Sequence, residues 1–441
     1  MENTTEQIYN LRVNHLNKMR IAVIGAGAAG LAALRHCTSQ SNKKSIEVIC
    51  YEQSGDIGGT WVYTPEVGRD AYGLSIHSSM YKNLRTNLPK EVMGFPDFPI
   101  PDNDKSYLTR TELLDFINTY CDHFELRKYI QFHHHVVLVK PLDGDNMRKW
   151  SVEVEDLEKK KVLVEVFDAI MICNGHYFQP NIPELEGHTS FKGRVLHSHD
   201  YRVPETFAGK KVVVFGAGPS GMDLALEISK HAHQVILSHH LKVPILTKFP
   251  SNVIQKPDVV QLREHQAVFK DGSKENVDTI FYCTGYKYSF PFLDKNCGVK
   301  VDRNMVTPLW KHLLAIESPT LAFVGLPYYV CAFSMFDLQV RFVLRFWQGF
   351  KKLPPKENML AEESMELKKK LSEGLHVQQF HMMGSKQGLY YEDLAKTADL
   401  DPLPPVLTSL HNESSQKFID DLLNYREDRY KIIDDHTYVQ L

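Results

Sequence analysis

The chain lacks the cysteine patterns that mark secreted proteins, zinc-binding proteins and dithiol enzymes. Its 441 residues include only 7 cysteines, and no two of them are closer than 13 residues. This spacing excludes a CxxC redox pair and a zinc site built on a cysteine pair. An odd, low number of thiols indicates reduced cysteines in a cytoplasmic protein. The polar N-terminus also lacks the apolar centre of a signal peptide.

A long apolar run and an excess of basic residues are missing as well. The most apolar stretch, residues 313–336, contains Glu317, Pro319 and Pro327, whereas a spanning helix needs about 20 uninterrupted apolar residues. We therefore expect no transmembrane anchor. The 51 Lys+Arg and 54 Asp+Glu residues give a net charge of −3. Such a chain has no basic surplus for a phosphate backbone, and we expect no nucleic-acid partner.

Apolar runs alternate with helix-like stretches, which predicts an α/β fold. The same order of strand, glycine turn, helix and strand occurs twice. Such repeats are typical of dinucleotide-binding (Rossmann-like) units with a doubly wound parallel sheet. The first unit comprises residues 20–24, 25–30, 31–38 and 46–51, and the second comprises residues 211–215, 216–221, 222–231 and 234–237.

The first glycine turn reads Gly-Ala-Gly-Ala-Ala-Gly. Its first glycine permits a tight turn, the second lets backbone approach a pyrophosphate, and the third lets the helix pack on the strand. Glu52 ends the next strand, where a carboxylate accepts hydrogen bonds from the ribose of an adenosine without a 2′-phosphate. The predicted contacts are Gly25, Ala26, Gly27, Ala28, Ala29, Gly30, Glu52 and Gln53.

A further pair of glycines, Gly58 and Gly59, precedes Thr60 and Trp61. Two glycines beside a large flat ring indicate backbone that passes close to a bulky ligand. Together with Glu52, this pattern favours a ligand that extends well beyond its pyrophosphate, as FAD does. We therefore predict that Gly59, Thr60 and Trp61 also contact FAD.

The second glycine turn, Gly-Ala-Gly-Pro-Ser-Gly, is followed by a strand with no carboxylate at its end. Ser238, His239 and His240 stand there instead, with Lys242 behind them. Hydroxyl, imidazole and ammonium groups suit a 2′-phosphate, which favours NADPH over NADH. The predicted NADPH contacts are Gly216, Gly218, Pro219, Ser220, Gly221, Met222, Asp223, Ser238, His239 and His240.

Two short strands at residues 169–173 and 279–283 bracket the second unit. We interpret them as the places where the chain leaves a first domain and returns to it. The predicted FAD-binding domain comprises residues 1–175 and 288–441, and the NADPH-binding insert comprises residues 176–287. Without a dithiol, hydride passed from nicotinamide to flavin needs another acceptor, and dioxygen is the obvious one.

Four further segments resemble motifs of the flavin-containing monooxygenase family. Residues 191–201 fit its FxGxxxHxxxY signature, and residues 281–286 resemble its second short-turn motif. Residues 85–99 contain the asparagine segment of the flavin site, and residues 337–339 match a late acidic-x-Gln element. The resemblance covers nearly the whole chain.

The resemblance implies that NADPH reduces FAD, that dioxygen adds to give a C4a-hydroperoxide, and that a soft nucleophile takes the distal oxygen. It makes Asn87 the catalytic residue and implies that Thr86, Leu88 and Gln339 contact FAD. No metal is required, so we interpret residues 133–135, three histidines, as a solvated strand edge. His197 in the signature is interpreted as structural. A homodimer or higher homo-oligomer is the family-level expectation.

The expected substrates are dioxygen and a small-molecule amine or thioether. Tertiary-amine N-oxygenation is preferred, while S-oxygenation stays open. Baeyer–Villiger oxygenation is less favoured, because that signature ends in Trp-Pro and this chain has Tyr201-Arg202. An uncoupled NADPH oxidase that releases H2O2 and a nucleotide-binding interaction module are further alternatives. Residues 237–240 resemble insect members, some of which N-oxygenate pyrrolizidine alkaloids.

Overall fold

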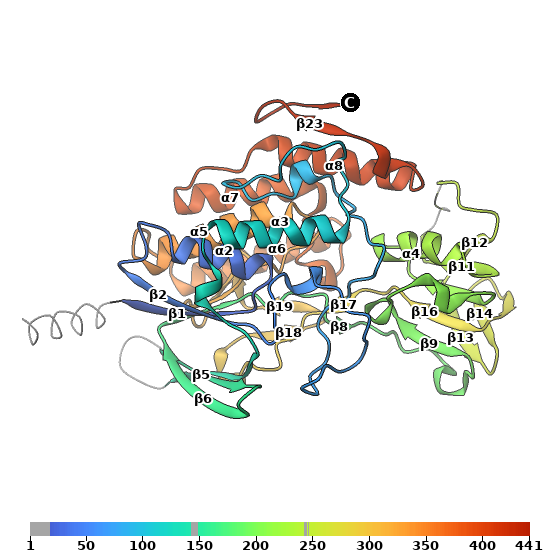
Figure 1. Cartoon of the computed structure of the whole chain (residues 1–441), viewed down its shortest axis with the longest axis horizontal. Coiled ribbons are helices and arrows are strands. Elements are labelled where there is room, and N and C mark those ends of the chain that lie inside the picture. Colours follow the sequence, from blue (N-terminus) through green and yellow to red (C-terminus); the bar gives the residue numbers. More distant parts are fainter. Residues whose placement is uncertain (1–17, 143–148, 242–244, 246) are drawn as a thin grey trace, which may run out of the picture.

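The computed structural model describes residues 18–142, 149–241, 245 and 247–441 (Figure 1). A seven-stranded sheet forms the centre of the larger body, and its strands are parallel except at the edge formed by β20 and β21. In order across the sheet, the strands are β20 (Leu309–Trp310), β21 (Leu314–Ala315), β22 (Leu321–Phe323), β7 (Ala169–Ile172), β1 (Met19–Ile24), β2 (Ile46–Tyr51) and β3 (Ile130–Gln131).

Both faces of this sheet are buried, which is why β1 reads as a continuous apolar run. Ile21 and Val23 pack against the helical layer, whereas Ala22 and Ile24 pack against a second, antiparallel sheet. Figure 1 shows helices above the central sheet and β5 and β6 below it. The helices of this body are α2 (Ala28–Cys37), α3 (Arg110–His123), α5 (Ala332–Trp347), α6 (Lys356–Ser372), α7 (Gln387–Ala398) and α8 (Pro405–Asp420), and the second sheet holds β4 (His134–Leu142), β5 (Lys149–Asp156) and β6 (Lys161–Phe167).

The smaller body contains a five-stranded, fully parallel sheet. Helix α4 (Pro219–Ser229) follows its central strand, and buried residues of a three-stranded antiparallel sheet share a core with Val213 and Ile236. The strands, in order, are β12 (Val253–Lys256), β11 (Gln234–Ser238), β10 (Lys211–Phe215), β16 (Thr279–Tyr282) and β9 (Arg194–His197), and the three-stranded sheet holds β13 (Val259–Arg263), β14 (Gln266–Phe269) and β15 (Lys274–Asn276).

The predicted fold class is confirmed: two doubly wound units occur, one between two parts of the other. Strands β2 and β10 coincide with the predicted ranges, and both turns lead directly into helices. The helices begin three residues earlier than predicted, because Ala28 and Pro219 already lie in the first turn. Among the described residues, no helix is long and apolar enough to cross a membrane.

Two connections join the bodies and run side by side. Strand β8 (Gln179–Pro180) enters the smaller body and pairs antiparallel with β17 (Tyr286–Lys287), which leaves it. The C-terminal segment adds a third connection, because Leu410, Phe418 and Tyr425 share a buried cluster with residues of β10, β11 and α4. The division at residues 175 and 287 stays a prediction, and the segment after α8 packs on both bodies. The remaining pairs are β18 (Lys300–Asp302) with β19 (Met305–Thr307) and β23 (Tyr430–Ile432) with β24 (Tyr438–Gln440).

Candidate active site

The first glycine turn leaves no room for side chains at its two ends. Gly25 has a φ of +101°, and a Cβ there would lie 2.7 Å from the carbonyl oxygen of Cys173. A Cβ on Gly30 would lie 1.9 Å from the carbonyl oxygen of Gly25. Helix α2 begins directly after Gly27, so its unpaired N–H groups face the turn. This arrangement fits a pyrophosphate at the helix N-terminus.

Glu52 stands at the end of β2 with its carboxylate oriented by the backbone. Its side chain accepts hydrogen bonds from the N–H groups of Ala26, at 2.8 Å, and Ser54, at 2.9 Å. Burial raises the pKa of Glu52, and these N–H donors oppose the rise. Although only 8% exposed, Glu52 lines the cavity, so its remaining lone pairs can accept ribose hydroxyls. The prediction of a ribose-binding carboxylate fits this geometry.

The second glycine turn is similar to the first at its two outer glycines. Gly216 has a φ of +109°, and a Cβ there would lie 2.5 Å from the carbonyl oxygen of Cys283. A Cβ on Gly221 would meet the carbonyl oxygen of Gly216 at 1.8 Å, while a Cβ on Gly218 would meet open space. The turn and the start of α4 therefore form a second cradle for phosphate groups.

A single cavity of about 2690 Å³ joins the two turns. Most of the predicted contact residues line it, although they come from segments far apart in the sequence. Six predicted contacts do not reach its wall: Ala26, Gly30, Gly221, Ser238, His239 and Gln339. The predicted residues on the wall are Gly25, Gly27, Ala28, Ala29, Glu52, Gln53, Gly59, Thr60, Trp61, Thr86, Asn87, Leu88, Gly216, Gly218, Pro219, Ser220, Met222, Asp223 and His240.

The end of β11 differs from its prediction. Ser238 is fully buried, and its hydroxyl donates to the carbonyl oxygen of Pro257 at 3.0 Å. His239 is 6% exposed, and its Nε2 lies 3.0 Å from Oε1 of Gln255. Ser238 ends β11 and His239 follows it, and each is held inside the protein by its own contact, so neither lines the cavity. Only His240 faces the cavity, and the predicted Lys242 lies outside the described residues.

Two residues that the sequence did not single out stand beside His240. Asp258 has a carboxylate oxygen 4.0 Å from Nδ1 of His240, and Lys270, just after β14, also lines the cavity. The backbone N–H of Lys270 donates to the carbonyl oxygen of Asp258 at 2.9 Å. No local pattern pointed to them, because they lie 18 and 30 residues after His240 in sequence.

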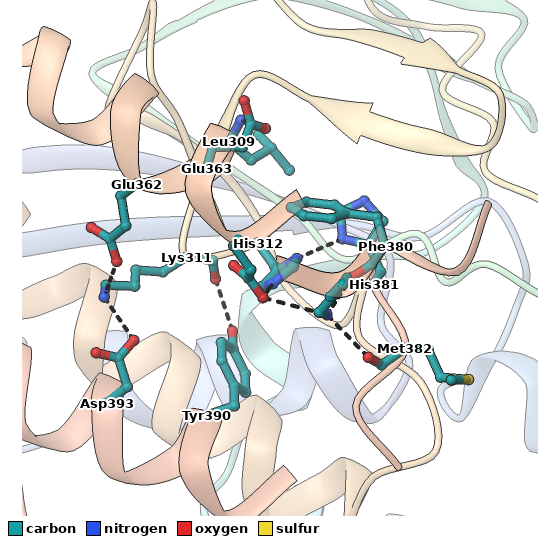
Figure 2. Close-up of polar contacts among 12 residues, drawn as sticks. Leu309, Lys311, His312, Glu362, Glu363, Phe380, His381, Met382, Tyr390 and Asp393 are labelled. Atoms are coloured by element: carbon teal, nitrogen blue, oxygen red, sulfur yellow. Dashed lines mark hydrogen bonds and ion pairs between the residues drawn. The ribbon is translucent and has the colours of Figure 1, made fainter. Parts of the chain in front are cut away.

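Gln339 reaches the cavity only through another residue. Its Oε1 accepts the backbone N–H of Gly325 at 2.9 Å, and Gly325 lines the cavity. Its Nε2 donates to the Tyr390 hydroxyl at 2.8 Å. Figure 2 shows that hydroxyl donating in turn to the carbonyl oxygen of Lys311. With both ends of its amide hydrogen-bonded inside the protein, Gln339 supports the cavity wall, and its contact with FAD stays a prediction.

Two buried histidines, His312 and His381, also support the cavity wall (Figure 2). Nδ1 of His312 lies 2.9 Å from Nδ1 of His381, whose Nε2 accepts the N–H of Val306 at 3.0 Å. The other nitrogen of His312 lies 2.8 Å from Glu366. Burial lowers the pKa of both imidazoles, so each is neutral at pH 7. The ring of His381 packs 5.2 Å from Tyr288 on the cavity wall.

Asn87 is exposed, but the residue before it is buried and firmly held. Thr86 donates its N–H to the carbonyl oxygen of Leu108 at 2.8 Å, and its hydroxyl accepts the N–H of Leu108 at 3.0 Å. The Asn87 side chain lines the cavity and makes no hydrogen bond to the part of the chain that the structure describes. Its amide is therefore free for a ligand.

Of the histidines interpreted as structural or as a strand edge, His197, His134 and His135 lie in strands, whereas His133 lies in the turn before β4 with a φ of +56°. His197 ends β9 and is 3% exposed, and its Nδ1 accepts the N–H of His199 at 3.1 Å. His134 and His135 begin β4 and pair with Asp156 and Glu155 on β5. Among the described residues, no group of three metal-ligating side chains is placed to hold an ion.

Two dinucleotide cradles that open into one cavity define a flavoprotein that works with a nicotinamide coenzyme. The family described as flavin-binding monooxygenase-like (FMO-like) matches residues 18–252 and 240–412. The chain therefore belongs to the flavin-containing monooxygenase family. It is an enzyme, and its cofactors are FAD and NADPH.

Relatives in this family act on different heteroatoms. The chain is 32% identical to senecionine N-oxygenase of Tyria jacobaeae over 95% of this chain and 91% of the relative. It is 36% identical to flavin-containing monooxygenase FMO GS-OX5 of Arabidopsis thaliana over 89% and 86% of the two chains. Among solved structures, S-allyl-L-cysteine S-oxygenase from Allium sativum superposes with a TM-score of 0.86 at 31% identity, covering 93% of this chain and 95% of that one.

Proposed function

We propose that this monooxygenase N-oxygenates tertiary amines, with pyrrolizidine alkaloids among its substrates. The net reaction consumes the amine, O2, NADPH and one proton, and yields the N-oxide, NADP⁺ and water. One oxygen atom forms the N–O bond and the other leaves as water. Two electrons come from NADPH and two from the amine lone pair.

The observation that carries the proposal is a wall of tyrosines in the shared cavity. Tyr177 and Tyr286 have ring centroids 5.5 Å apart, and Tyr328 and Tyr329 have centroids 5.3 Å apart. All four line the cavity, as does Tyr288. Burial raises the pKa of Tyr286 and of Tyr328 to about 12, so these hydroxyls stay uncharged at pH 7.

Aromatic faces attract the polarised carbons around an amine nitrogen and bind its cationic form through cation–π contacts. An amine must nevertheless lose its proton before its lone pair can react. A wall of uncharged rings binds the amine without a carboxylate that would hold the protonated form.

The chain's own residues are assigned to binding and positioning. Bound flavin supplies the redox chemistry, because it accepts hydride from NADPH and passes electrons to dioxygen. Glu52 and the first turn hold the FAD adenosine and pyrophosphate, and the second turn holds those of NADPH. Asn87 offers an amide N–H₂ next to the reacting groups, and a neutral donor of this kind stabilises developing negative charge without releasing a proton.

The test is product formation from a panel of nucleophiles by the flavin-loaded enzyme. Senecionine, a simple tertiary amine and an alkyl aryl thioether are each supplied with NADPH and air, and N-oxide, sulfoxide, peroxide and NADPH consumption are measured. We expect about one N-oxide per NADPH with the amines. Peroxide as the sole product with every substrate would refute the proposal and favour an NADPH oxidase.

Thioether S-oxygenation is the second candidate. It is favoured by the overall superposition with S-allyl-L-cysteine S-oxygenase, whose name gives its reaction. The two candidates are separated by a competition experiment at equal amine and thioether concentrations. A several-fold excess of sulfoxide over N-oxide would favour the second.

A further inference from the structure

We propose that Arg426, in the C-terminal segment, is a positioning residue that fixes the NADPH-binding helix α4 relative to the Asn87 loop. The inference rests on the proposed function, because it assigns α4 to NADPH and the loop to the reacting groups. Its consequence is that this segment couples NADPH oxidation to oxygenation.

The Arg426 guanidinium contacts both bodies at once. Its Nη1 donates to Oδ1 of Asp223 on α4 at 2.6 Å. Its Nε donates to the carbonyl oxygen of Thr86 at 3.1 Å, and its Nη2 donates to that of Arg85 at 3.2 Å. The planar fork of arginine suits three acceptors in fixed directions, and a lysine ammonium does not reproduce it. The two carbonyl groups directly precede Asn87 in the chain.

Asp223 sits where a coenzyme phosphate needs positive surroundings. It lies near the start of α4 and lines the cavity beside Gly218. Its second carboxylate oxygen accepts a hydrogen bond from the Tyr81 hydroxyl. The side chains of Asp223 and Arg426 are only 14% and 16% exposed, so solvent screens this carboxylate weakly. Arg426 therefore cancels a charge that would repel a pyrophosphate.

The C-terminal segment is itself anchored to both bodies. Its turn, η10 (Tyr425–Glu427), buries Tyr425 against Tyr107 and Phe418. The Arg85 guanidinium donates to the carbonyl oxygen of Arg426 at 3.0 Å, so the two arginines hold each other's backbone. The N–H of Leu422 donates to the Thr247 hydroxyl at 3.1 Å.

The elements before and after η10 also contact the segment that follows Asn87. Helix α8 and strand β23 both contact η2 (Lys90–Val92), which follows Asn87. Figure 1 shows the red C-terminal part lying over α3 and extending toward α4. The guanidinium of Arg426 is thus the polar centre of a junction between the two bodies.

The contacts predict two effects that substitutions can separate. Asp223 needs a positive charge, which any cation supplies, whereas the Arg85 and Thr86 carbonyl groups need the fork of arginine. Arg426→Met should remove both the positive charge beside Asp223 and the hydrogen bonds to the two carbonyl groups. Arg426→Lys should remove only those hydrogen bonds. The double variant Asp223→Asn with Arg426→Met should remove the unpaired charge and leave the loop unheld.

The experiment measures NADP⁺ affinity by titration, product formed per NADPH consumed, and hydrogen exchange of residues 86–92 in flavin-loaded protein. We expect Arg426→Met to weaken NADP⁺ binding about ten-fold, the size of one charge-assisted contact. Arg426→Lys and the double variant should bind NADP⁺ within about three-fold of the parent. All three should show faster exchange of residues 86–92 and several-fold less product per NADPH.

Arg429→Met is the matched control, because Arg429 is exposed on the same segment and should change no readout. Parent-like exchange and coupling in Arg426→Lys would overturn the positioning role. Failure of the double variant to recover NADP⁺ affinity would overturn the charge role. If Arg426→Met does not fold, Arg426→Lys still tests the positioning role. Asp223→Asn alone then tests the charge role, because it should bind NADP⁺ at least as tightly as the parent.

A merely structural Arg426 would lower flavin content and melting temperature while the folded fraction kept parental coupling, and this result would also overturn the inference. Failure of the proposed function is recognised separately. In that case the parent itself makes only peroxide, while NADP⁺ affinity and hydrogen exchange still report on Arg426.

Discussion

The two glycine turns have nearly the same backbone, yet their surroundings differ. At the first turn, the N–H of Gly58 donates to the carbonyl oxygen of Ala26 at 3.1 Å, so a second loop lies across the turn. A Cβ on Gly27 would lie 3.6 Å from the Cα of Gly59, whereas a Cβ on Gly218 would meet nothing. The first cradle is therefore covered and the second is open.

The difference suits the two cofactors. A flavin that stays bound through many turnovers benefits from a covered cradle, and a nicotinamide coenzyme that is exchanged needs an open one. The residues that follow β2 in the first unit and β11 in the second unit also differ in how exposed they are. Glu52 is buried and held by backbone donors, while His240 has an 85% exposed side chain. The glycine pattern alone does not distinguish a resident cofactor from an exchanging one.

Equivalent valine substitutions in the two turns should give the largest contrast. In Gly27→Val the branched side chain would meet the Gly59 backbone and fill the pyrophosphate position, so the purified protein should hold almost no flavin. In Gly218→Val the side chain has space, so the protein should fold with full flavin content. Its reduction by NADPH should fall about a hundred-fold or more, since phosphate contacts worth several kcal/mol are blocked. Flavin absorbance and anaerobic reduction rates check both.

The contrast would be broken if Gly27→Val kept its flavin or if Gly218→Val lost it. Gly209→Val is a control for a glycine-to-valine change away from the cavity, and it differs from Gly27 and Gly218 in having a positive φ. It should cost stability because of its backbone conformation and leave both cofactor readouts intact in the folded fraction.

Asn87→Ala tests the proposed role of the Asn87 amide as a hydrogen-bond donor to the reacting groups. Losing one preorganised donor near a reactive intermediate costs about 2.7–4 kcal/mol by analogy with oxyanion-hole deletions. Oxygenated product should therefore fall roughly a hundred-fold, while flavin content and reduction by NADPH stay near parental values and peroxide rises. Product and peroxide assays run on the same sample measure the partition. Parental coupling in a folded variant would remove Asn87 from the mechanism.

Coenzyme preference should be a smaller effect. The enzyme should favour NADPH over NADH by about ten-fold, the size of one charge-assisted phosphate contact. Lys270→Ala and His240→Ala should each reduce that ratio, because these two groups face the cavity where Ser238 and His239 do not. His233→Ala, at an exposed position outside the cavity, is the control. Unchanged kcat/KM ratios in both variants would place the 2′-phosphate elsewhere.

Acid sensitivity should be the smallest effect and should be shared by both bodies. Burial lowers the pKa of His77, His176, His197 and His411 to about 4 in the folded state. Unfolded chains bind these protons near pH 6.5, so stability is complete above that pH and is lost as pH falls toward 4. The melting temperature should fall by several degrees across this window.

His197→Asn should make that decline shallower, whereas His231→Asn, at an exposed position, should leave its slope unchanged. A melting temperature that is constant between pH 6.5 and 4.5 in the parent would contradict the burial argument. Differential scanning fluorimetry at fixed ionic strength measures the slope.

Features carried by short runs of sequence were predicted well. The two strand–turn–helix–strand units depend on local periodicity and on glycine, and the structure contains both. Glu52 was also identified, because the ribose carboxylate follows its turn at a fixed interval within one unit. Asn87 came from a family motif and not from periodicity, and the structure adds that its amide is unpartnered within the described residues.

Features that depend on contacts between distant segments could not be predicted in this way. Ser238 and His239 are buried by contacts to Pro257 and Gln255, and the sequence does not reveal which residues lie opposite the end of β11. Lys270 and Asp258 reach the cavity beside His240 from the segments that flank β13 and β14, and Gln339 forms hydrogen bonds with Gly325 and Tyr390.

The sequence by itself determined that this protein binds two dinucleotides in parallel α/β units, because a tight turn, a phosphate cradle and helix–strand packing each require glycine at one position. The tertiary structure decided which side chains meet at the shared cavity and how the two units are held together. Arg426 shows why: it lies 203 residues from Asp223 and 340 from Thr86. No local pattern encodes such contacts, since they exist only when burial of the C-terminal segment brings the three residues together.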